Sequence, residues 1–150
     1  MHTLRVTHLN AVMHSRLATV TLQTPLLQAA QRLSETHIGL VVVCQPDGAM
    51  AGVISKSDIV RQIGHCMGSA CHTLASALMT TDVMCCEPTE LLSDVLARMQ
   101  EHGLVHVPVL DPQKRPLGVV NARDALRALV AEGEYEQSLL FDYVMGVGFH

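Results

Sequence analysis

The fold of this chain follows from two stretches of one pattern, Gly52-Val53-Ile54-Ser55-Lys56-Ser57-Asp58 and Gly118-Val119-Val120-Asn121-Ala122-Arg123-Asp124. Each runs from glycine through β-branched residues to a small polar residue, and each ends on an aspartate three positions later. This pattern predicts a strand that passes into a helix whose first N–H groups have no partner inside the helix. Because those donors and the helix dipole favour negative charge, both helix starts are candidate anion sites. For one copy alone, a simple helix cap is the plainer interpretation.

The two stretches belong to an internal repeat. Three pairs of residues are each separated by 66 positions: Met13 and Met79, Gly52 and Gly118, Asp58 and Asp124. Thr24 and Thr89 are separated by 65, which predicts a one-residue gap inside the first helix of the pair. Because neither half buries its apolar face alone, the two repeats are expected to pack against each other.

Hydrophobic periodicity predicts the order strand, helix, strand, strand, helix in both halves. The first half should contain strands at 17–22, 40–44 and 50–54, and helices at 26–36 and 56–66. The second helix is expected to turn Ile59, Val60 and Ile63 toward the core. The second half should contain strands at 83–86, 105–110 and 117–120, and helices at 91–101 and 122–131. The fold class is therefore α+β, with a lead-in at 1–11, repeats at 12–68 and 69–131, and a C-terminal helical tail at 132–150.

The composition fits a small domain with an aliphatic core. Of the residues 49% are hydrophobic, yet there are only two Phe, two Tyr and no Trp, and all four aromatic residues fall in the tail. The formal net charge of −4 argues against nucleic acid as a partner. No apolar run approaches the roughly 20 residues that cross a bilayer, so no membrane partner is expected. Five cysteines without disulfide spacing, after an N-terminus that lacks a secretory apolar segment, predict a cytoplasmic protein.

The repeated pattern resembles a tandem pair of CBS domains, a Bateman module, over about residues 12–130. In the first repeat it is carried by Gly39-Leu40-Val41-Val42-Val43 and the Gly52 stretch, and in the second by Val105-His106-Val107-Pro108-Val109 and the Gly118 stretch. The resemblance implies a pseudo-two-fold pair with two clefts that bind an adenosine-containing ligand, such as AMP, ADP, ATP or S-adenosylmethionine, with no required cofactor. It also implies a homodimer whose ligand state is sensed by a regulated partner protein.

The resemblance places twelve residues of this chain in the nucleotide sites. Asp58 and Asp124 would accept hydrogen bonds from the ribose hydroxyls, because an ionised carboxylate only accepts. The other ten would contact the phosphate or line the base slot and the first strands: Ser55, Lys56, Asn121, Arg123, Val20, Leu40, Val83, Met84, His106 and Pro108. The first repeat has Val42 where the second has Pro108, and the second has Asn121 where the family has Ser or Thr. These departures predict unequal clefts. Arg123 in the first turn of the second helix could pair with phosphate, as Lys56 could in the first repeat, and the second cleft is expected to be the better suited to a phosphorylated ligand.

Two other functions remain as alternatives. One is a ligand-free dimerisation or adaptor module. The other is a metal- or redox-responsive protein, based on His65-Cys66 and Cys71-His72. Because adjacent residues rarely both bind one ion, an ordinary linker is the favoured interpretation of that cluster. No nucleophile elbow, phosphate loop or zinc-protease motif is present, so neither catalytic residues nor enzyme activity are predicted.

Overall fold

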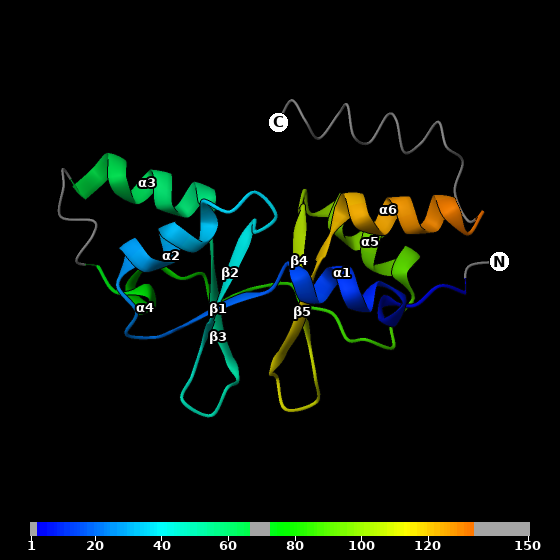
Figure 1. Cartoon of the computed structure of the whole chain (residues 1–150), viewed down its shortest axis with the longest axis horizontal. Coiled ribbons are helices and arrows are strands. Elements are labelled where there is room, and N and C mark those ends of the chain that lie inside the picture. Colours follow the sequence, from blue (N-terminus) through cyan, green and yellow to red (C-terminus); the bar gives the residue numbers. More distant parts are fainter. Residues whose placement is uncertain (1–2, 67–72, 134–150) are drawn as a thin grey trace.

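The structure is a computed structural model that describes residues 3–66 and 73–133, with no side-chain description for 64–66. It confirms the α+β fold class and the two-repeat organisation. Figure 1 shows the two repeats side by side, with strands near the centre and helices on the outer parts of each half. The predicted tail helix lies outside the described residues, as does most of the linker His/Cys cluster. In the described part of the chain, no helix combines the length and apolarity that a membrane crossing needs.

The first repeat is built on a three-stranded sheet in the order β1-β2-β3. Strand β1 (Ala18–Thr21) is parallel to β2 (Leu40–Cys44), which is antiparallel to β3 (Met50–Ser55). Helix α2 (Leu26–Leu33) connects the parallel pair, and α3 (Lys56–Cys66) follows β3. The short helix α4 (Ala75–Leu78) then contacts β1 and β3. The core is aliphatic, as the composition predicts.

The second repeat has a two-stranded sheet, and the N-terminal segment completes its core. Strands β4 (His106–Leu110) and β5 (Pro116–Asn121) are antiparallel, and they alternate with α5 (Leu92–Glu101) and α6 (Ala122–Ala131). The 3₁₀ turn η1 (Val6–Leu9) and helix α1 (Asn10–Ser15) pack on this repeat, η1 against α6 and α1 against β5. Figure 1 shows α1 in the half that contains α5 and α6. Four N-terminal side chains enter this core: Leu4, Val6, Leu9 and Met13.

The internal repeat extends to the starts of the secondary-structure elements. Helices α2 and α5, strands β2 and β4, strands β3 and β5, and helices α3 and α6 all begin 66 residues apart. Both hairpins carry an irregularity at the same point, Val43/Cys44 and Val109/Leu110. The expectation of a gap inside the first helix is therefore wrong, because the offset is already 66 where that helix begins.

Gly52 and Gly118 lie within strands, where another chain segment comes too close for a side chain. A Cβ at Gly52 would be 2.7 Å from the carbonyl oxygen of Thr80. A Cβ at Gly118 would be 2.8 Å from the backbone carbonyl of Met13. Thr80 therefore packs against β3 of the first repeat, and Met13 packs against β5 of the second repeat. The segment that begins each half thus contacts a strand of the other half. Glycine is required at both positions because only it permits that backbone approach.

The segment 83–86 differs from the sequence prediction, which makes it a strand. Only Cys86 pairs with the sheet, through a single parallel bridge to β4. Its N–H donates to the carbonyl of Pro108 at 3.0 Å, and its carbonyl accepts from the N–H of Leu110 at 3.0 Å. The next bond of this ladder would need an N–H at position 108, which proline lacks. Val42 stands at the equivalent position of the first repeat, and there β1 forms four paired residues.

The prediction that α3 turns three apolar residues inward is wrong for two of them. Ile59 is buried, whereas Val60 is 69% exposed and Ile63 is 60% exposed. Their equivalents in α6, Leu126 and Leu129, are buried because the N-terminal segment and α5 cover that face. Helical periodicity therefore identified an apolar face but not whether another segment of the chain covers it.

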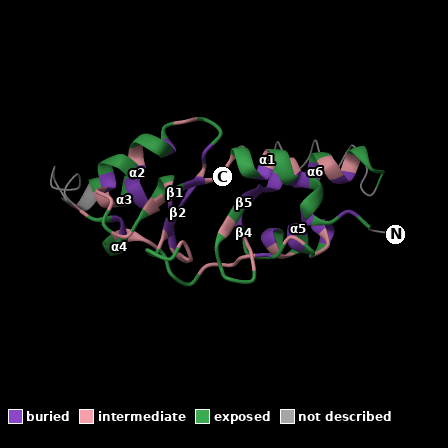
Figure 2. Cartoon of the chain, turned by 60° about the horizontal axis from the view of Figure 1, so that its bottom comes forward, coloured by how far each residue is buried: buried purple, intermediate pink, exposed green. Residues whose placement is uncertain are grey.

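The two repeats are joined through an apolar layer between their sheets. Figure 2 shows buried residues on the strands of both halves. Leu40, Val42 and Val53 from the first repeat form one buried cluster with Val119 from the second. The hairpin tips also meet, since the N–H of Met50 donates to the carbonyl of Lys114 at 2.8 Å. These contacts fix the space between the repeats in which the candidate site lies.

Candidate functional site

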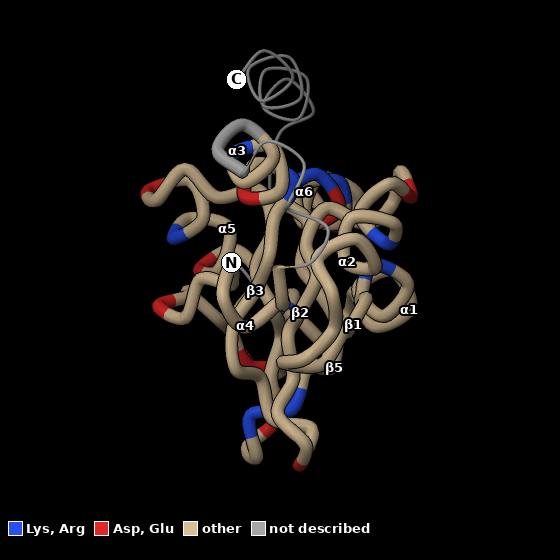
Figure 3. Tube along the Cα trace, turned by 90° about the vertical axis from the view of Figure 1, so that its left-hand side faces the viewer, with Lys and Arg blue, Asp and Glu red and all other residues tan. Residues whose placement is uncertain are grey.

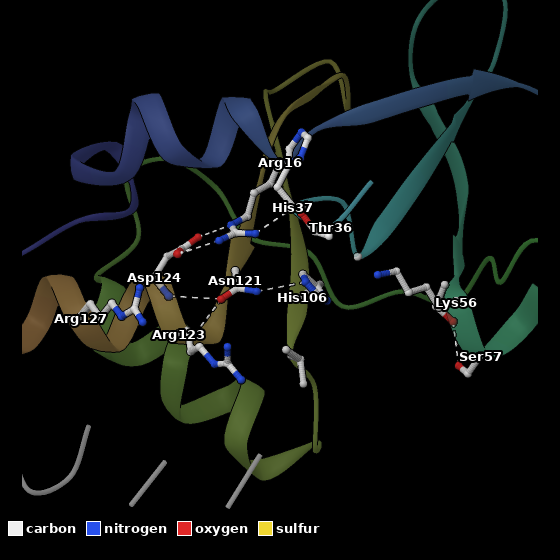
Figure 4. Close-up of a pocket in the computed structure, with 13 residues that line it drawn as sticks. Arg16, Thr36, His37, Lys56, Ser57, His106, Asn121, Arg123, Asp124 and Arg127 are labelled. Carbon is white, nitrogen blue, oxygen red and sulfur yellow. Dashed lines mark hydrogen bonds and ion pairs between the residues drawn. The ribbon is translucent and has the colours of Figure 1, made fainter. Parts of the chain in front are cut away.

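Two cavities lie between the repeats, and their charges differ. The first, which we name the basic cleft, has a volume of about 770 Å³. Four cationic side chains line it, Arg16, Lys56, Arg123 and Arg127, against one carboxylate, Asp124. Figure 4 shows these residues around His106 and Asn121, and Figure 3 shows Lys and Arg along α6. The remaining lining residues are Thr36, His37, Gly39, Ser55, Ser57, Val105, His106 and Asn121.

Arg16 closes one side of the basic cleft through an ion pair with Asp124. Its Nε donates to one carboxylate oxygen, and its Nη2 donates to the other at 3.0 Å. Its Nη1 also donates to the carbonyl of His37 at 3.0 Å. One guanidinium thus links the segment after α1, helix α6 of the second repeat and the loop before β2 of the first (Figure 4). Bidentate guanidinium–carboxylate contacts are stronger than neutral hydrogen bonds, so this pair holds Asp124 in place.

Asn121 caps α6 and contacts His106 at the same time. Its Oδ1 accepts from the N–H groups of Arg123 and Asp124 at 2.9 and 3.2 Å. Because the oxygen is used for the cap, the amide nitrogen faces His106 Nε2 at 3.1 Å and donates to it. The acceptor nitrogen of His106 must then be unprotonated, so this geometry requires the neutral imidazole. The amide at position 121 therefore supplies a donor that a Ser or Thr cap would not direct to the ring.

The electrostatics of His106 agree with that geometry. The pKa of His106 is lowered to about 4, first by burial of the ring and then by the positive charges of Arg16 and Lys56, against an opposite effect of Asp124. The ring lies directly over Gly39, where a Cβ would be 2.2 Å from it. A neutral, close-packed ring therefore separates the two cavities, since His106 and Ser55 line both.

The second cavity, which we name the acidic cleft, has a volume of about 580 Å³. Asp58 and Asp82 line it, and among the described residues at its surface there is no Lys or Arg. Asp58 is buried and forms a capping box with Ser55: its Oδ2 accepts from the N–H of Ser55 at 2.9 Å, and its own N–H donates to Ser55 Oγ at 3.3 Å. Its other oxygen accepts from Arg61 Nη2 at 3.2 Å. The remaining lining residues are Leu40, Val53, Thr80, Val83, Met84, His102, Leu104 and His106, with Ser55.

The structure brings ten of the twelve sequence-predicted site residues to one of the clefts. Lys56, Asn121, Arg123 and Asp124 line the basic cleft, and Leu40, Asp58, Val83 and Met84 line the acidic cleft. Ser55 and His106 line both. Pro108 is instead buried in β4, and Val20 packs against the core of the first repeat. The ligand-binding role of the ten remains a prediction.

Sequence reasoning missed several residues at the clefts, above all Arg16, Arg127 and Asp82. They lie outside the strand-to-helix stretches on which the prediction was based. One signal was present: Arg16 and Asp82 are 66 residues apart, so they occupy the same position in the two halves. Their cleft positions follow from the repeat, but the pair of Arg16 with Asp124 depends on tertiary contact.

The cysteines give no support to a metal or redox centre within the described residues. No group of three His, Cys, Asp or Glu is arranged there to hold a metal ion. Burial, followed by the nearby charge of Glu90, raises the pKa of the Cys86 thiol to about 12. Such a thiol stays protonated at neutral pH and is a poor nucleophile.

Comparison with protein families gives two matches to the CBS domain, at residues 9–65 and 75–131. The chain belongs to the CBS-domain family. It is a tandem CBS-domain pair, which confirms the sequence-based interpretation. Solved structures agree: a CBS-domain-containing protein from Agrobacterium tumefaciens is 26% identical, with a TM-score of 0.66 over 75% of this chain and 83% of that one. An uncharacterized conserved protein from Pyrococcus horikoshii is 25% identical, with a TM-score of 0.70 over 85% and 93%.

A more distant structure has the same fold. It is the CBS domain pair of protein MJ0100 in complex with 5′-methylthioadenosine and S-adenosyl-L-methionine, 20% identical, with a TM-score of 0.70 over 88% of this chain and 99% of that one.

Two curated relatives are longer than this chain. It is 25% identical over 118 residues to a homoserine O-acetyltransferase of Methanococcoides burtonii, which is 79% of this chain but 23% of the relative. It is 27% identical over 103 residues to an uncharacterized 17.7 kDa protein of Acidianus ambivalens, covering 69% of this chain and 61% of that protein. The chain thus spans less than two thirds of these two relatives.

Proposed function

We propose that this CBS pair is a regulatory module that senses an adenosine nucleotide, AMP, ADP or ATP, in the basic cleft. The observation that carries this proposal is the convergence of Arg16, Lys56, Arg123 and Arg127 on one cavity beside the N-terminus of α6. Guanidinium groups match the geometry of phosphate oxygens, and a helix N-terminus adds positive potential. The cavity volume of about 770 Å³ also lies in the range of small-molecule sites.

Asp124 supplies the complementary contact for the ribose. Its carboxylate accepts two hydrogen bonds, which suits the vicinal diol, but both oxygens are held by Arg16. A nucleotide that binds Asp124 through its ribose must therefore displace Arg16, and the released guanidinium is then free to pair with the phosphate. The new pairing of Arg16 with the phosphate would offset the loss of its ion pair with Asp124.

This exchange also provides a means of signalling. Arg16 binds the carbonyl of His37 in the first repeat and Asp124 in the second, so its movement would change a contact between the repeats. A partner protein can respond only if it distinguishes the free and bound arrangements. The MJ0100 complex with two adenosine derivatives supports this ligand class for the present chain. We also propose that the protein is a cytoplasmic homodimer, with the exposed Val60 and Ile63 of α3 in the interface.

Calorimetric titration with adenosine, AMP, ADP and ATP tests the proposal. Asp124→Ala should weaken adenosine about tenfold, because it removes the ribose acceptor. Arg123→Gln should weaken AMP about fivefold and leave adenosine unchanged. Arg32→Gln, which removes a cation from α2 outside both clefts, is the matched control. If none of the four ligands binds or raises the melting temperature near millimolar concentration, the proposal is wrong, since binding to the native state must stabilise it.

The second candidate function is a ligand-free dimerisation or adaptor module. It is favoured by two observations: Arg16 already satisfies Asp124, and α3 presents Val60 and Ile63 to solvent. Absence of ligand-induced stabilisation together with a dimeric mass in solution would select this function.

A further inference from the structure

The two clefts are equivalent by the internal repeat, and this makes their residues directly comparable. Positions 66 residues apart line them in corresponding pairs: Arg16 and Asp82, Thr36 and His102, His106 and Leu40, Asn121 and Ser55, Asp124 and Asp58. Each cavity therefore has an aspartate near a helix start, Asp124 or Asp58, and a charged residue at the equivalent positions 16 and 82. Only the sign of the latter charge differs.

Three of the four cations of the basic cleft are replaced by uncharged or acidic residues at the equivalent positions, and the fourth has a counterpart that does not line the acidic cleft. Arg16 corresponds to Asp82, Lys56 to Ala122, and Arg123 to Ser57. Arg127 corresponds to Arg61, which binds Asp58 at 3.2 Å and is not among the lining residues. A phosphate placed in the acidic cleft would thus meet two carboxylates where the basic cleft offers four cations.

The acidic cleft nevertheless keeps what a nucleoside needs. Asp58 is buried at the position that Asp124 occupies in the other cleft, and Leu40 lines the acidic cleft at the position equivalent to His106. As at Asp124, both carboxylate oxygens already accept, here from the Ser55 N–H and from Arg61, so a ribose would displace the Arg61 contact. Val83, Met84 and Leu104 add further apolar surface for a base or an aliphatic substituent. Asp82 is exposed at the cavity and attracts positive charge.

We infer that the acidic cleft takes an adenosine derivative without phosphate, uncharged or cationic at its 5′ position, so that the two clefts select ligands of opposite charge. This inference rests on the proposed function only in assuming that the ligand contains adenosine. The selection itself follows from the replacement of Arg16 by Asp82 at equivalent positions. Because the ligands differ, both clefts would be filled at once.

The experiment titrates the full chain with its basic cleft saturated by AMP. Wild-type protein should bind one AMP per chain, and then one S-adenosylmethionine, which carries a sulfonium, or one adenosine. Asp82→Arg should weaken S-adenosylmethionine at least tenfold and leave the first AMP unchanged. Glu132→Arg, an equal change of net charge at the far end of α6, should leave both affinities within twofold of wild type.

Several results would overturn the inference. These are two AMP per wild-type chain, displacement of S-adenosylmethionine by AMP, no second ligand on the AMP-saturated protein, and equal S-adenosylmethionine affinities in the two charge variants. A chain that binds S-adenosylmethionine but no AMP, and loses the former on Asp82→Arg, would support the acidic cleft and refute the nucleotide function of the basic one.

Discussion

At the residue scale, Arg16 occupies the carboxylate of Asp124, the proposed ribose acceptor of the basic cleft. It forms two hydrogen bonds to Asp124 and a third to the carbonyl of His37. The motif that led to Asp124 is local in sequence, whereas its partner lies 108 positions away. The carboxylate was therefore predictable as a site residue, but its occupation by a guanidinium was not.

Arg16→Gln should change nucleoside and nucleotide binding in opposite directions. Adenosine should bind about fivefold more tightly, because the ribose no longer has to displace the ion pair between Arg16 and Asp124. AMP should lose part of its advantage over adenosine, because the variant lacks one of the four cations that line the cleft. The measurement is the ratio of the two dissociation constants by calorimetry. Arg127→Gln is the control: it removes a lining cation that is not bonded to Asp124, so it should weaken AMP without improving adenosine.

His106 makes stability depend on pH. Its pKa is about 4 in the native protein against 6.5 as a free side chain, so between these values the unfolded chain holds the extra proton. The free energy of unfolding should therefore fall as pH decreases from 6.5 to 4, by up to about 3 kcal/mol from this residue. His106→Leu introduces the residue found at the equivalent position of the first repeat, Leu40, and should remove that part of the pH dependence. Urea unfolding at several pH values measures it, and an unchanged slope in the variant would contradict the assignment.

The same residue reports on the basic cleft. Arg16 and Lys56 lower the His106 pKa, and Asp124 raises it slightly. A bound phosphate would offset both cations, so AMP should raise the His106 pKa, and Lys56→Gln should raise it without ligand. The pH titration of the ring by NMR gives the value directly. An unchanged pKa at saturating AMP would place the phosphate elsewhere.

At the element scale, α6 begins on a cap that also serves the site. Asn121→Ala should cost about 1 kcal/mol of stability through loss of the cap, and it also removes the donor to His106. Asn121→Ser, which copies Ser55 of the first repeat, should keep most of the cap but lose the contact with the ring. Chemical denaturation of both variants, alone and combined with His106→Leu, separates the two roles. Losses that are simply additive in the combined variants would contradict a stabilising contact between Asn121 and His106.

Element boundaries show what local pattern can and cannot predict. Periodicity and the 66-residue offset were enough for β2 to β5, α5 and α6, because those elements bury one continuous apolar face. The prediction of a strand at 83–86 was wrong because the pairing depends on an N–H that Pro108 lacks. Pro108 lies in another strand, so the local pattern does not include it. The predicted burial of the apolar face of α3 was wrong for a similar reason, since a helical pattern does not tell which chain segment covers the face.

At the scale of the whole molecule, the N-terminal segment and the second repeat form one core. Gly118→Ala should destabilise the protein by about 2 kcal/mol, because the new methyl group would press on the backbone of Met13. The loss should be seen as a lower urea midpoint and as faster amide exchange in α1. Leu117→Ala changes the neighbouring, more exposed residue of the same strand and should cost less than half as much. A protected α1 in Gly118→Ala would mean that the contact with β5 is not what holds this helix.

The exposed face of α3 makes self-association testable by comparing its residues with the equivalent residues of α6. Leu126 and Leu129 of α6 are buried beneath the chain's own N-terminal segment, whereas Val60 and Ile63 at equivalent positions are 69% and 60% exposed. If a second copy covers them, the double variant Val60→Ser, Ile63→Ser should shift the solution mass from dimer toward monomer, with little effect on unfolding of the monomer. Light scattering after gel filtration, over a range of protein concentrations, gives the dissociation constant. Leu27→Ser provides the control, because Leu27 is similarly exposed at 52% but lies on a different helix, α2. A wild-type monomer, or a dimer that the double variant leaves intact while Leu27→Ser weakens it, would assign the interface to a different face.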